Sequence, residues 1–148
     1  MNTTPLLEIN DLTVTYPHDR LQGKSELKAL DQISIKLNTG KIIGIVGESG
    51  AGKSTIGKAI LGLLDPPAKI LNGEIKLLGS PIIGLSETEY ESFRGKQIGY
   101  IYQNPMTALN PVLTIGEQVI EAIVANTNMR GKEAYDYAVE LLERADVS

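Results

Sequence analysis

A run of nine residues, Gly47 to Thr55, combines glycines, a lysine and hydroxyl side chains at the spacing G-x-x-x-x-G-K-[ST]. Glycines at these places let successive backbone N–H groups turn into one concavity, which binds phosphate oxygens. The lysine that follows places a compact cation over the phosphates, and the next hydroxyl binds Mg²⁺, an ion that prefers hard oxygen ligands. The chemistry that these residue types predict is therefore binding of a nucleoside triphosphate together with magnesium.

The parts of this phosphate loop have different expected contacts. Lys53 is expected over the β- and γ-phosphates, Ser54 at the magnesium ion, and Thr55 at the α-phosphate through its N–H or hydroxyl. The first turn of the helix that follows adds unpaired N–H donors and the positive end of the helix dipole. The predicted nucleotide-binding residues of the loop are Gly47, Glu48, Ser49, Gly50, Ala51, Gly52, Lys53, Ser54 and Thr55.

The elements on either side must position this loop. Residues 41–46, before it, are short, apolar and β-branched, which predicts a buried strand. Behind it, apolar residues recur at the spacing of one helix face: Ile56, Ala59, Ile60, Leu63 and Leu64. Strand, glycine turn and helix form the setting that the motif requires, and they favour a phosphate cradle over a glycine-rich turn that happens to hold a lysine.

The rest of the chain divides into an early part rich in strands and a late part rich in helices. Apolar alternation predicts strands at residues 6–16, 29–37, 70–78, 81–83 and 97–102. Capping boxes at Ser86–Glu89 and Thr114–Glu117 predict the starts of two helices, and a third amphipathic helix is expected from Lys132 onward. The strands at the start of the chain indicate an antiparallel sheet beside the nucleotide site.

Composition limits the function classes. The chain has 148 residues and a formal net charge of -4, and its lysines and arginines are scattered, which argues against nucleic acid as a partner. It has no cysteine, so disulfides, cysteine-ligated zinc and thiol catalysis are excluded. Neither a secretory signal nor an apolar run long enough for a membrane span is apparent, and a cytoplasmic location is expected.

Two further residues belong to the candidate site. Tyr16 ends a predicted strand just before a polar loop, where its ring could stack on a base; from the residues alone, a half-buried strand tyrosine is the more common interpretation. Gln103 follows the predicted strand at residues 97–102 and enters a loop. Together with the phosphate loop, Tyr16 and Tyr102-Gln103 resemble the nucleotide-binding domain of ABC transporters. The run from Gln103 to Pro111, continuing into residues 114–118, resembles the peptide and nickel importer ATPases of that family.

This resemblance covers the whole chain and implies roles for both residues. In the family, an aromatic residue at the position of Tyr16 stacks on adenine, which reverses the interpretation above. The glutamine that matches Gln103 reaches Mg²⁺ and the attacking water, so Lys53 and Gln103 are the expected catalytic residues, with Ser54 and Gln103 at the metal and MgATP as the ligand. Asn104 stands where the family more often has an acidic residue.

The resemblance also implies an architecture and partners. The expected fold is the α/β P-loop NTPase fold of an ABC nucleotide-binding domain, incomplete at the C-terminus. Residues 1–103 would form the ATP-binding core with an antiparallel β subdomain, and residues 104–148 the start of the helical subdomain. The expected partners are membrane permease subunits, a second ATP-binding subunit in a homo- or heterodimer, and indirectly a solute-binding protein. The location would be peripheral, on the inner face of the cell membrane.

Several motifs of the family have no counterpart in this sequence. The signature motif, the Walker B aspartate, the adjoining glutamate and the switch histidine come later in the family's chain, and the only histidine here is His18. These 148 residues are therefore expected to bind ATP weakly and not to hydrolyse it. Two function classes stay open: a transport ATPase subunit, with peptides the first and nickel the second candidate cargo, or a nucleotide-binding module without turnover, either a split half or a non-transport ABC protein.

Overall fold

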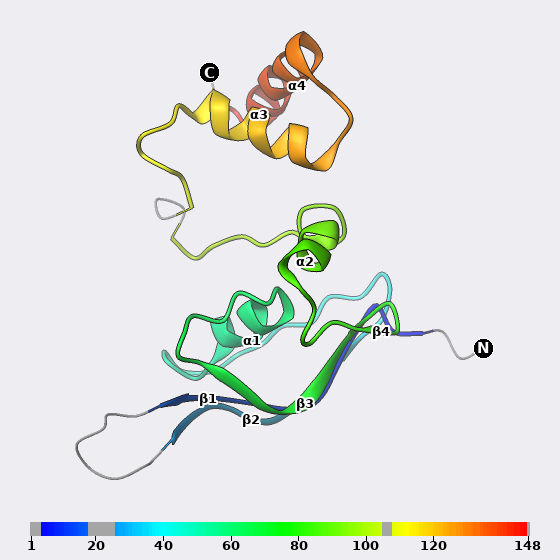
Figure 1. The fold of residues 1–148 in the computed structure, drawn as a ribbon, viewed down its shortest axis with the longest axis vertical. Helices are drawn as coiled ribbons and strands as arrows, with labels where there is room; N and C mark the ends of the chain where they lie inside the picture. Colours follow the sequence, from blue (N-terminus) through cyan, green and yellow to red (C-terminus); the bar gives the residue numbers. More distant parts are fainter. Residues whose placement is uncertain (1–3, 18–25, 105–107, 148) are drawn as a thin grey trace. The chain divides into compact units, whose positions relative to one another are not determined.

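The computed structural model describes residues 4–17, 26–104 and 108–147. The chain divides into two compact units, Met1–Ser92 and Phe93–Ser148, which are described separately (Figure 1). None of the helices that the structure describes has both the length and the apolar character needed to span a membrane. The predicted division into residues 1–103 and 104–148 follows function rather than packing and stays a prediction.

Four strands of the first unit form one antiparallel sheet in the order β2-β1-β3-β4 (Figure 1). Their bounds are Leu7–Pro17 for β1, Glu26–Leu37 for β2, Lys69–Leu77 for β3 and Ser80–Pro81 for β4. The three long strands confirm the predictions from apolar alternation. The fourth, predicted at residues 81–83, is shorter, because Gly84 at φ 82° turns the chain away. Ile82 N–H nevertheless still donates to the Ile75 carbonyl at 2.9 Å.

Strand β1 lies at the centre of the sheet and carries much of the core. Residues 12–15 are all buried, so the strand is covered on both faces there, and Ile75 of β3 packs in the same interior. The pairing with β2 is irregular: Val14 is opposite Leu30 while Thr15 is opposite Lys28. Ala29 is thus an extra residue on β2, a β-bulge that bends the strand locally.

Helix α1 (Lys53–Ile60) begins directly after the phosphate loop and ends earlier than predicted. The apolar stripe was expected to continue the helix to Leu64, but Gly62 adopts φ 65° and closes the helix. In this turn the Leu63 N–H donates to the Lys58 carbonyl at 2.8 Å, as in a Schellman motif. The extended helix was therefore a wrong prediction, because glycine takes the left-handed backbone that ends a helix at little cost.

The Gly62 turn at the end of α1 packs against helix α2 (Glu87–Phe93). A Cβ atom on Gly62 would lie 2.5 Å from the ring of Tyr90, so only glycine permits this contact. Tyr90 is buried, and its hydroxyl donates to the Ile82 carbonyl at 2.6 Å. The far end of α1 is thereby fixed against α2.

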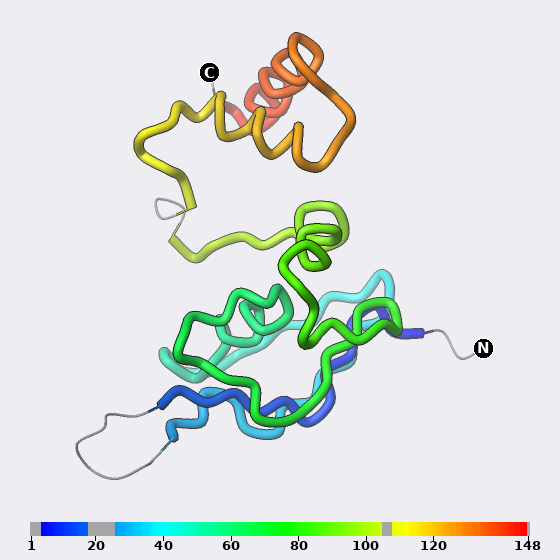
Figure 2. The backbone as a smooth tube through the Cα atoms, viewed as in Figure 1, coloured from blue at the N-terminus to red at the C-terminus, as the bar shows by residue number. Residues whose placement is uncertain are grey.

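The predicted strand before the phosphate loop does not form. Residues 41–46, whose path Figure 2 traces, form neither helix nor strand, and Ile42 and Val46 are 98% and 96% exposed. A strand requires a neighbour to accept its hydrogen bonds and a layer to cover its side chains. Within the described ranges, residues 41–46 pair with no strand and their side chains are exposed. The apolar pattern alone was therefore not enough to form a strand here.

The predicted strand at residues 97–102 is also absent. The one pairing in this stretch is an isolated bridge between Arg94 and Ile98, and Ile101 is 95% exposed. Its tyrosines instead pack on each other, with the rings of Tyr100 and Tyr102 edge to face at a centroid distance of 4.8 Å. The reason is the same as for residues 41–46, because no described strand lies beside this segment to pair with it.

The second unit is built on two packed helices, α3 (Ile115–Asn126) and α4 (Gly131–Arg144) (Figure 1). Its buried core consists of Ile123, Ala134 and Ala138. The small side chains of Ala134 and Ala138 let the two helices approach closely, and larger, partly buried side chains surround them: Val119, Ile120, Val124, Met129, Tyr137 and Leu141. Both helices begin close to where the sequence predicted them.

Both predicted capping boxes are present. The Thr114 hydroxyl accepts from the Glu117 N–H at 3.2 Å, and the Glu117 carboxylate accepts from the Thr114 N–H and hydroxyl, each at 2.8 Å. These bonds lower the pKa of Glu117, the backbone bond most strongly. At α2 the Glu89 carboxylate accepts from the Ser86 hydroxyl at 2.6 Å and from the Ser86 N–H at 2.7 Å, and these bonds lower the pKa of Glu89, the hydroxyl bond most strongly.

Acid should therefore fray both helix starts. A carboxyl group with a lowered pKa in the folded chain stabilises it above the usual glutamate value of about 4.3, and this stabilisation is lost as the pH falls through the lowered value. Glu117→Gln should keep the box at α3, since glutamine also fits the third position, but remove its acid sensitivity. The protection factors of the amides at the start of α3, measured as the pH is lowered, would contradict this if they fell equally in Glu117→Gln and the parent chain.

Candidate nucleotide-binding site

The glycines of the phosphate loop adopt the backbone that the motif demands at two places. Gly50 has φ 83° and Gly52 has φ 82°, both in the left-handed region, whereas Gly47 does not. Gly52 is also the residue before α1, and it offers no side chain to cap the helix. The first N–H groups of α1 are therefore open to an anion that lies in the loop, where the helix dipole also favours negative charge.

A second constraint on Gly52 comes from the sheet. A Cβ atom at this position would lie 2.3 Å from the carbonyl oxygen of Ala29 and 2.9 Å from a methyl group of Leu30. Ala29 is the bulged residue of β2, so the bulge brings its carbonyl against the loop. Gly52 is thus needed both for the turn and for close packing of the loop on β2.

Lys53 lies across its own loop. Its Nζ donates to the carbonyl oxygens of Gly47 at 2.7 Å and Glu48 at 2.6 Å, while the side chain stays exposed. An ammonium group has three N–H donors, so one donor is left to meet a phosphate oxygen. The loop therefore holds its cation over the concavity before any phosphate arrives. The predicted contact of Lys53 with the β- and γ-phosphates stays a prediction.

The remaining loop residues suit contact with a ligand. Glu48, Ser49, Ala51 and Ser54 are exposed, and Thr55 is half-buried. In the described part of the chain no three histidine or acidic side chains come together as a metal site. Magnesium does not require such a cage, because it takes most of its ligands from nucleotide phosphates and water. The exposed Ser54 hydroxyl in the first turn of α1 fits the role of the single protein ligand on this side.

Tyr16 belongs to the same unit as the loop. It is half-exposed near the end of β1, opposite Leu27 of β2. The phosphate loop packs on Ala29, which lies two residues from Leu27 along β2. From the spacing between neighbouring strands and the rise of two residues along a strand, the Cα atoms of Tyr16 and Ala29 lie roughly 8 Å apart. The segment at residues 18–25 that follows Tyr16 lies outside the described residues.

Gln103 is placed in the second unit. It is exposed and lies on a bend after the Tyr100–Tyr102 ring pair. Its expected contact with magnesium and water stays a prediction. The adjoining Pro105 and Met106 lie outside the described residues.

The structural roles of two residues, Ala29 and Gln118, were not predicted from the sequence. Ala29 carries no motif, because a bulge depends on how two strands pair and not on one residue type. Gln118 was part of the run that resembles importer ATPases, but the hydrogen bonds of its amide to Asn110 were not foreseen. The one available signal was its spacing of four residues from Thr114, which places the two on one helix face.

Comparison with known proteins gives the family. The sequence model described as ABC transporter matches residues 30–147. The chain is 40% identical to the oligopeptide transport ATP-binding protein AppD of Bacillus subtilis, over 97% of this chain and 43% of AppD. It is 41% identical to OppD of Mycobacterium tuberculosis, over 98% of the chain and 23% of OppD. It is 38% identical to OppD of Salmonella typhimurium, over 93% of this chain and 40% of that OppD.

The fold agrees with this assignment. The dimeric ATP-binding cassette MJ0796, solved in a post-hydrolysis state with ADP and Pi, matches with a TM-score of 0.79 at 27% identity, over 95% of this chain and 57% of that one. A second dimeric structure of MJ0796, described as a bacterial ABC transporter cassette, gives a TM-score of 0.77. The chain thus spans less than half the length of the curated relatives and just over half of the solved cassette. With a family match over most of its residues, the chain belongs to the ABC transporter family.

Proposed function

We propose that this chain holds MgATP in the loop from Gly47 to Thr55 as part of the ATP-binding subunit of a peptide importer. The observation that carries the proposal is the loop itself, in which two left-handed glycines and the start of α1 surround the Lys53 ammonium group, and the Gly47 and Glu48 carbonyls hold that group in place. Family membership makes ATP the expected ligand, and a solved relative was bound to ADP and Pi.

The cargo is inferred from the named relatives. Several are called oligopeptide transport ATP-binding proteins, which supports peptides over nickel as the transported solute. A dimeric neighbour supports pairing with a second ATP-binding subunit. In such an assembly the protein would lie at the cytoplasmic face of the membrane, attached to permease subunits and served indirectly by a solute-binding protein.

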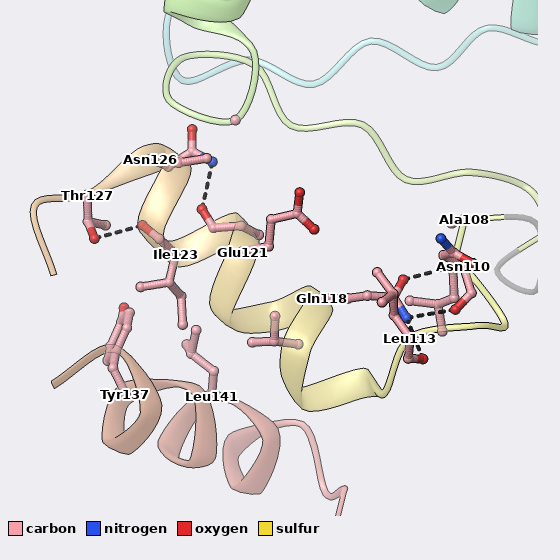
Figure 3. Close-up of a pocket in the computed structure, with 15 residues that line it drawn as sticks. Ala108, Asn110, Leu113, Gln118, Glu121, Ile123, Asn126, Thr127, Tyr137 and Leu141 are labelled. Carbon is pink, nitrogen blue, oxygen red and sulfur yellow. Dashed lines mark hydrogen bonds between the residues drawn. The ribbon is translucent and has the colours of Figure 1, made fainter. Parts of the chain in front are cut away.

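The second unit is the proposed contact with the permease. It contains a pocket of about 870 Å³ whose walls come from the segment before α3 and from α3 and α4 (Figure 3). Leu109 and Leu113, which line this pocket, and the neighbouring Val112 are exposed apolar side chains in a segment without helix or strand. Exposed apolar residues gathered beside a pocket are typical of a protein interaction site.

Uptake measurements test the function directly. Deleting the gene that encodes this chain should abolish import of a labelled oligopeptide and leave nickel uptake unchanged. Restoring the gene should recover import, whereas restoring it with Lys53→Ala should not. Normal peptide import in the deletion strain would overturn the proposal. If import were normal and the purified protein still bound ATP, the alternative of a nucleotide-binding module without transport would be favoured instead.

Tyr16 offers a test of the adenine contact. Stacking of a base on an aromatic ring contributes roughly 1–3 kcal/mol and does not need the hydroxyl group. Tyr16→Phe should therefore bind ATP almost normally, while Tyr16→Ala should lose about tenfold in affinity. Titration with a fluorescent ATP analogue measures both. Equal losses in the two variants would indicate that the hydroxyl, and not the ring, makes the contact.

A further inference from the structure

A second bulge interrupts strand β2 shortly after the one at Ala29. Asp31 and Gln32 stand opposite a single residue of β1, Thr13, so this bulge also adds one residue to β2. Leu30 alone lies between the two bulges, and it is 2% exposed. The two bulges therefore fix the place of one short stretch of the strand, Ala29 and Leu30.

This stretch is where the phosphate loop packs on the sheet. A Cβ atom on Gly52 would clash with the Ala29 carbonyl oxygen and with a methyl group of Leu30, so the loop has no space to move toward β2. The reverse also holds, because a shift of the stretch would either push the loop or leave it without support. Whatever holds the second bulge in place therefore also holds the loop.

The second bulge has a strained backbone that a buried hydroxyl group holds. Gln32 has φ 52°, in the left-handed region where residues other than glycine are strained. Its N–H donates to the Thr13 hydroxyl oxygen at 3.2 Å, and Thr13 is buried. An ion pair between Lys28 and Asp31 spans the same stretch, but both side chains are about half exposed, and such pairs contribute little. A strained residue persists only where its surroundings hold it, and the Thr13 hydroxyl supplies such a hold.

We infer that Thr13 is a positioning residue of the phosphate loop. Its hydroxyl group holds Gln32 in the left-handed backbone, and the bulge in turn keeps the Ala29–Leu30 stretch against the loop. Without this bond Gln32 is free to leave the left-handed region, and the loop loses its fixed support. A loop that is less well ordered in advance binds its ligand more weakly. The inference rests on the proposed function, since ATP is the ligand only under that proposal.

Two variants of Thr13 separate the hydroxyl group from the packing. Thr13→Val keeps nearly the shape of the buried side chain but removes the acceptor, whereas Thr13→Ser keeps the acceptor and loses a methyl group. Titration of the full chain with a fluorescent ATP analogue should show an affinity about fivefold lower or more in Thr13→Val, the low end of coupling between two sites. Thr13→Ser should bind close to the parent value. The reverse order would show that the methyl group supports the loop and would overturn the inference.

Another hydroxyl-held bulge in the same sheet supplies a matched control. Asp11 of β1 has φ 47°, and its N–H donates to the Ser34 hydroxyl at 2.9 Å. This bulge lies on β1, whereas the loop packs on the Ala29–Leu30 stretch of β2. Ser34→Ala should thus free Asp11 in the same way but leave the ATP affinity unchanged. Equal losses in Ser34→Ala and Thr13→Val would indicate a general weakening of the sheet and refute the specific role of Thr13.

Glycine at position 32 tests the strain directly. Because glycine takes the left-handed backbone at little cost, the bulge then no longer needs the hydrogen bond to persist. Adding Gln32→Gly to Thr13→Val should therefore recover most of the ATP affinity that Thr13→Val loses by itself. If the double variant recovered nothing, the strained backbone would not be the link between Thr13 and the loop, and the inference would fail.

Hydrogen exchange without nucleotide separates this inference from the proposed function. The Ala51 N–H donates to the Glu48 carbonyl and the Ile56 N–H to the Gly52 carbonyl, both at 3.2 Å. The protection factors of these two amides should fall about fivefold or more in Thr13→Val, in proportion to the lost affinity, and stay unchanged in Ser34→Ala. Unchanged protection in Thr13→Val would overturn the positioning role. A parent chain that bound no ATP would instead overturn the proposed function, and the exchange result would still decide whether Thr13 orders the loop.

Discussion

Replacing Gly52 by alanine should destabilise the chain by about 2–5 kcal/mol and remove measurable ATP binding. Two costs combine in this estimate: a non-glycine residue in the left-handed region costs about 1–2 kcal/mol, and forcing a methyl group into a filled space costs about 1–3 kcal/mol. The methyl group would meet the Ala29 carbonyl at 2.3 Å, so either the loop or the bulged strand has to move. Both moves displace the phosphate cradle.

Gly40→Ala is the matched control for this prediction. Gly40 has φ 72°, so alanine there suffers the same backbone strain, but a Cβ atom would have no neighbour within 4 Å. Denaturant unfolding of both variants should show Gly52→Ala at least about 1 kcal/mol less stable than Gly40→Ala, the lower bound of the overpacking cost. Gly40→Ala should bind ATP like the parent. Equal stabilities would show that the contact with Ala29 can relax freely and that only the turn constrains Gly52.

Lys53→Ala is the second change with a large expected effect. Hydrogen bonds to charged groups contribute roughly 1.5–3 kcal/mol each, so ATP affinity should fall about tenfold or more. The variant also loses the two hydrogen bonds that the Lys53 Nζ donates to the Gly47 and Glu48 carbonyls, which connect the loop to the start of α1. The amides of the loop should accordingly exchange faster even without nucleotide.

Lys58→Ala controls for the loss of positive charge. Lys58 lies on the same helix and forms an ion pair with Asp65, away from the loop carbonyls. Its replacement should leave ATP affinity within about twofold, because a surface charge pair is worth roughly 0–1 kcal/mol. Titration with a fluorescent ATP analogue measures both variants. If Lys58→Ala lost as much affinity as Lys53→Ala, a general charge effect would explain the result and the specific role of Lys53 would be refuted.

Local sequence signals were sufficient where local bonds decide the structure. The capping boxes at Ser86 and Thr114 formed as predicted, since each box is closed by residues three apart. The three long strands also formed, because the alternation of β1 and β3 finds partners within the chain. The turn of the phosphate loop was predictable because Gly50 and Gly52 take the left-handed backbone within the motif itself, whereas the ligand contacts of the loop residues stay predictions.

Signals that depend on distant partners were not sufficient. The apolar runs at residues 41–46 and 97–102 have strand composition, yet no described strand pairs with either of them. The end of α1 was missed because Gly62 could have been tolerated inside a helix, and its role became visible only with Tyr90 packed against it. The bulge at Ala29 and the bonds of Gln118 likewise require the three-dimensional pairing of segments.

The contact between Gly62 and Tyr90 gives α1 a mechanical property. The eight residues of α1 form a helix about 12 Å long, which moves as a rigid rod compared with a single side chain. One end of the rod carries Lys53 and the phosphate cradle, and the other end has no spare space beneath the Tyr90 ring. An axial shift of the rod when phosphate is gained or lost must therefore press on the ring or draw away from it. The Gly62–Tyr90 contact therefore links the position of α1 mechanically to that of α2.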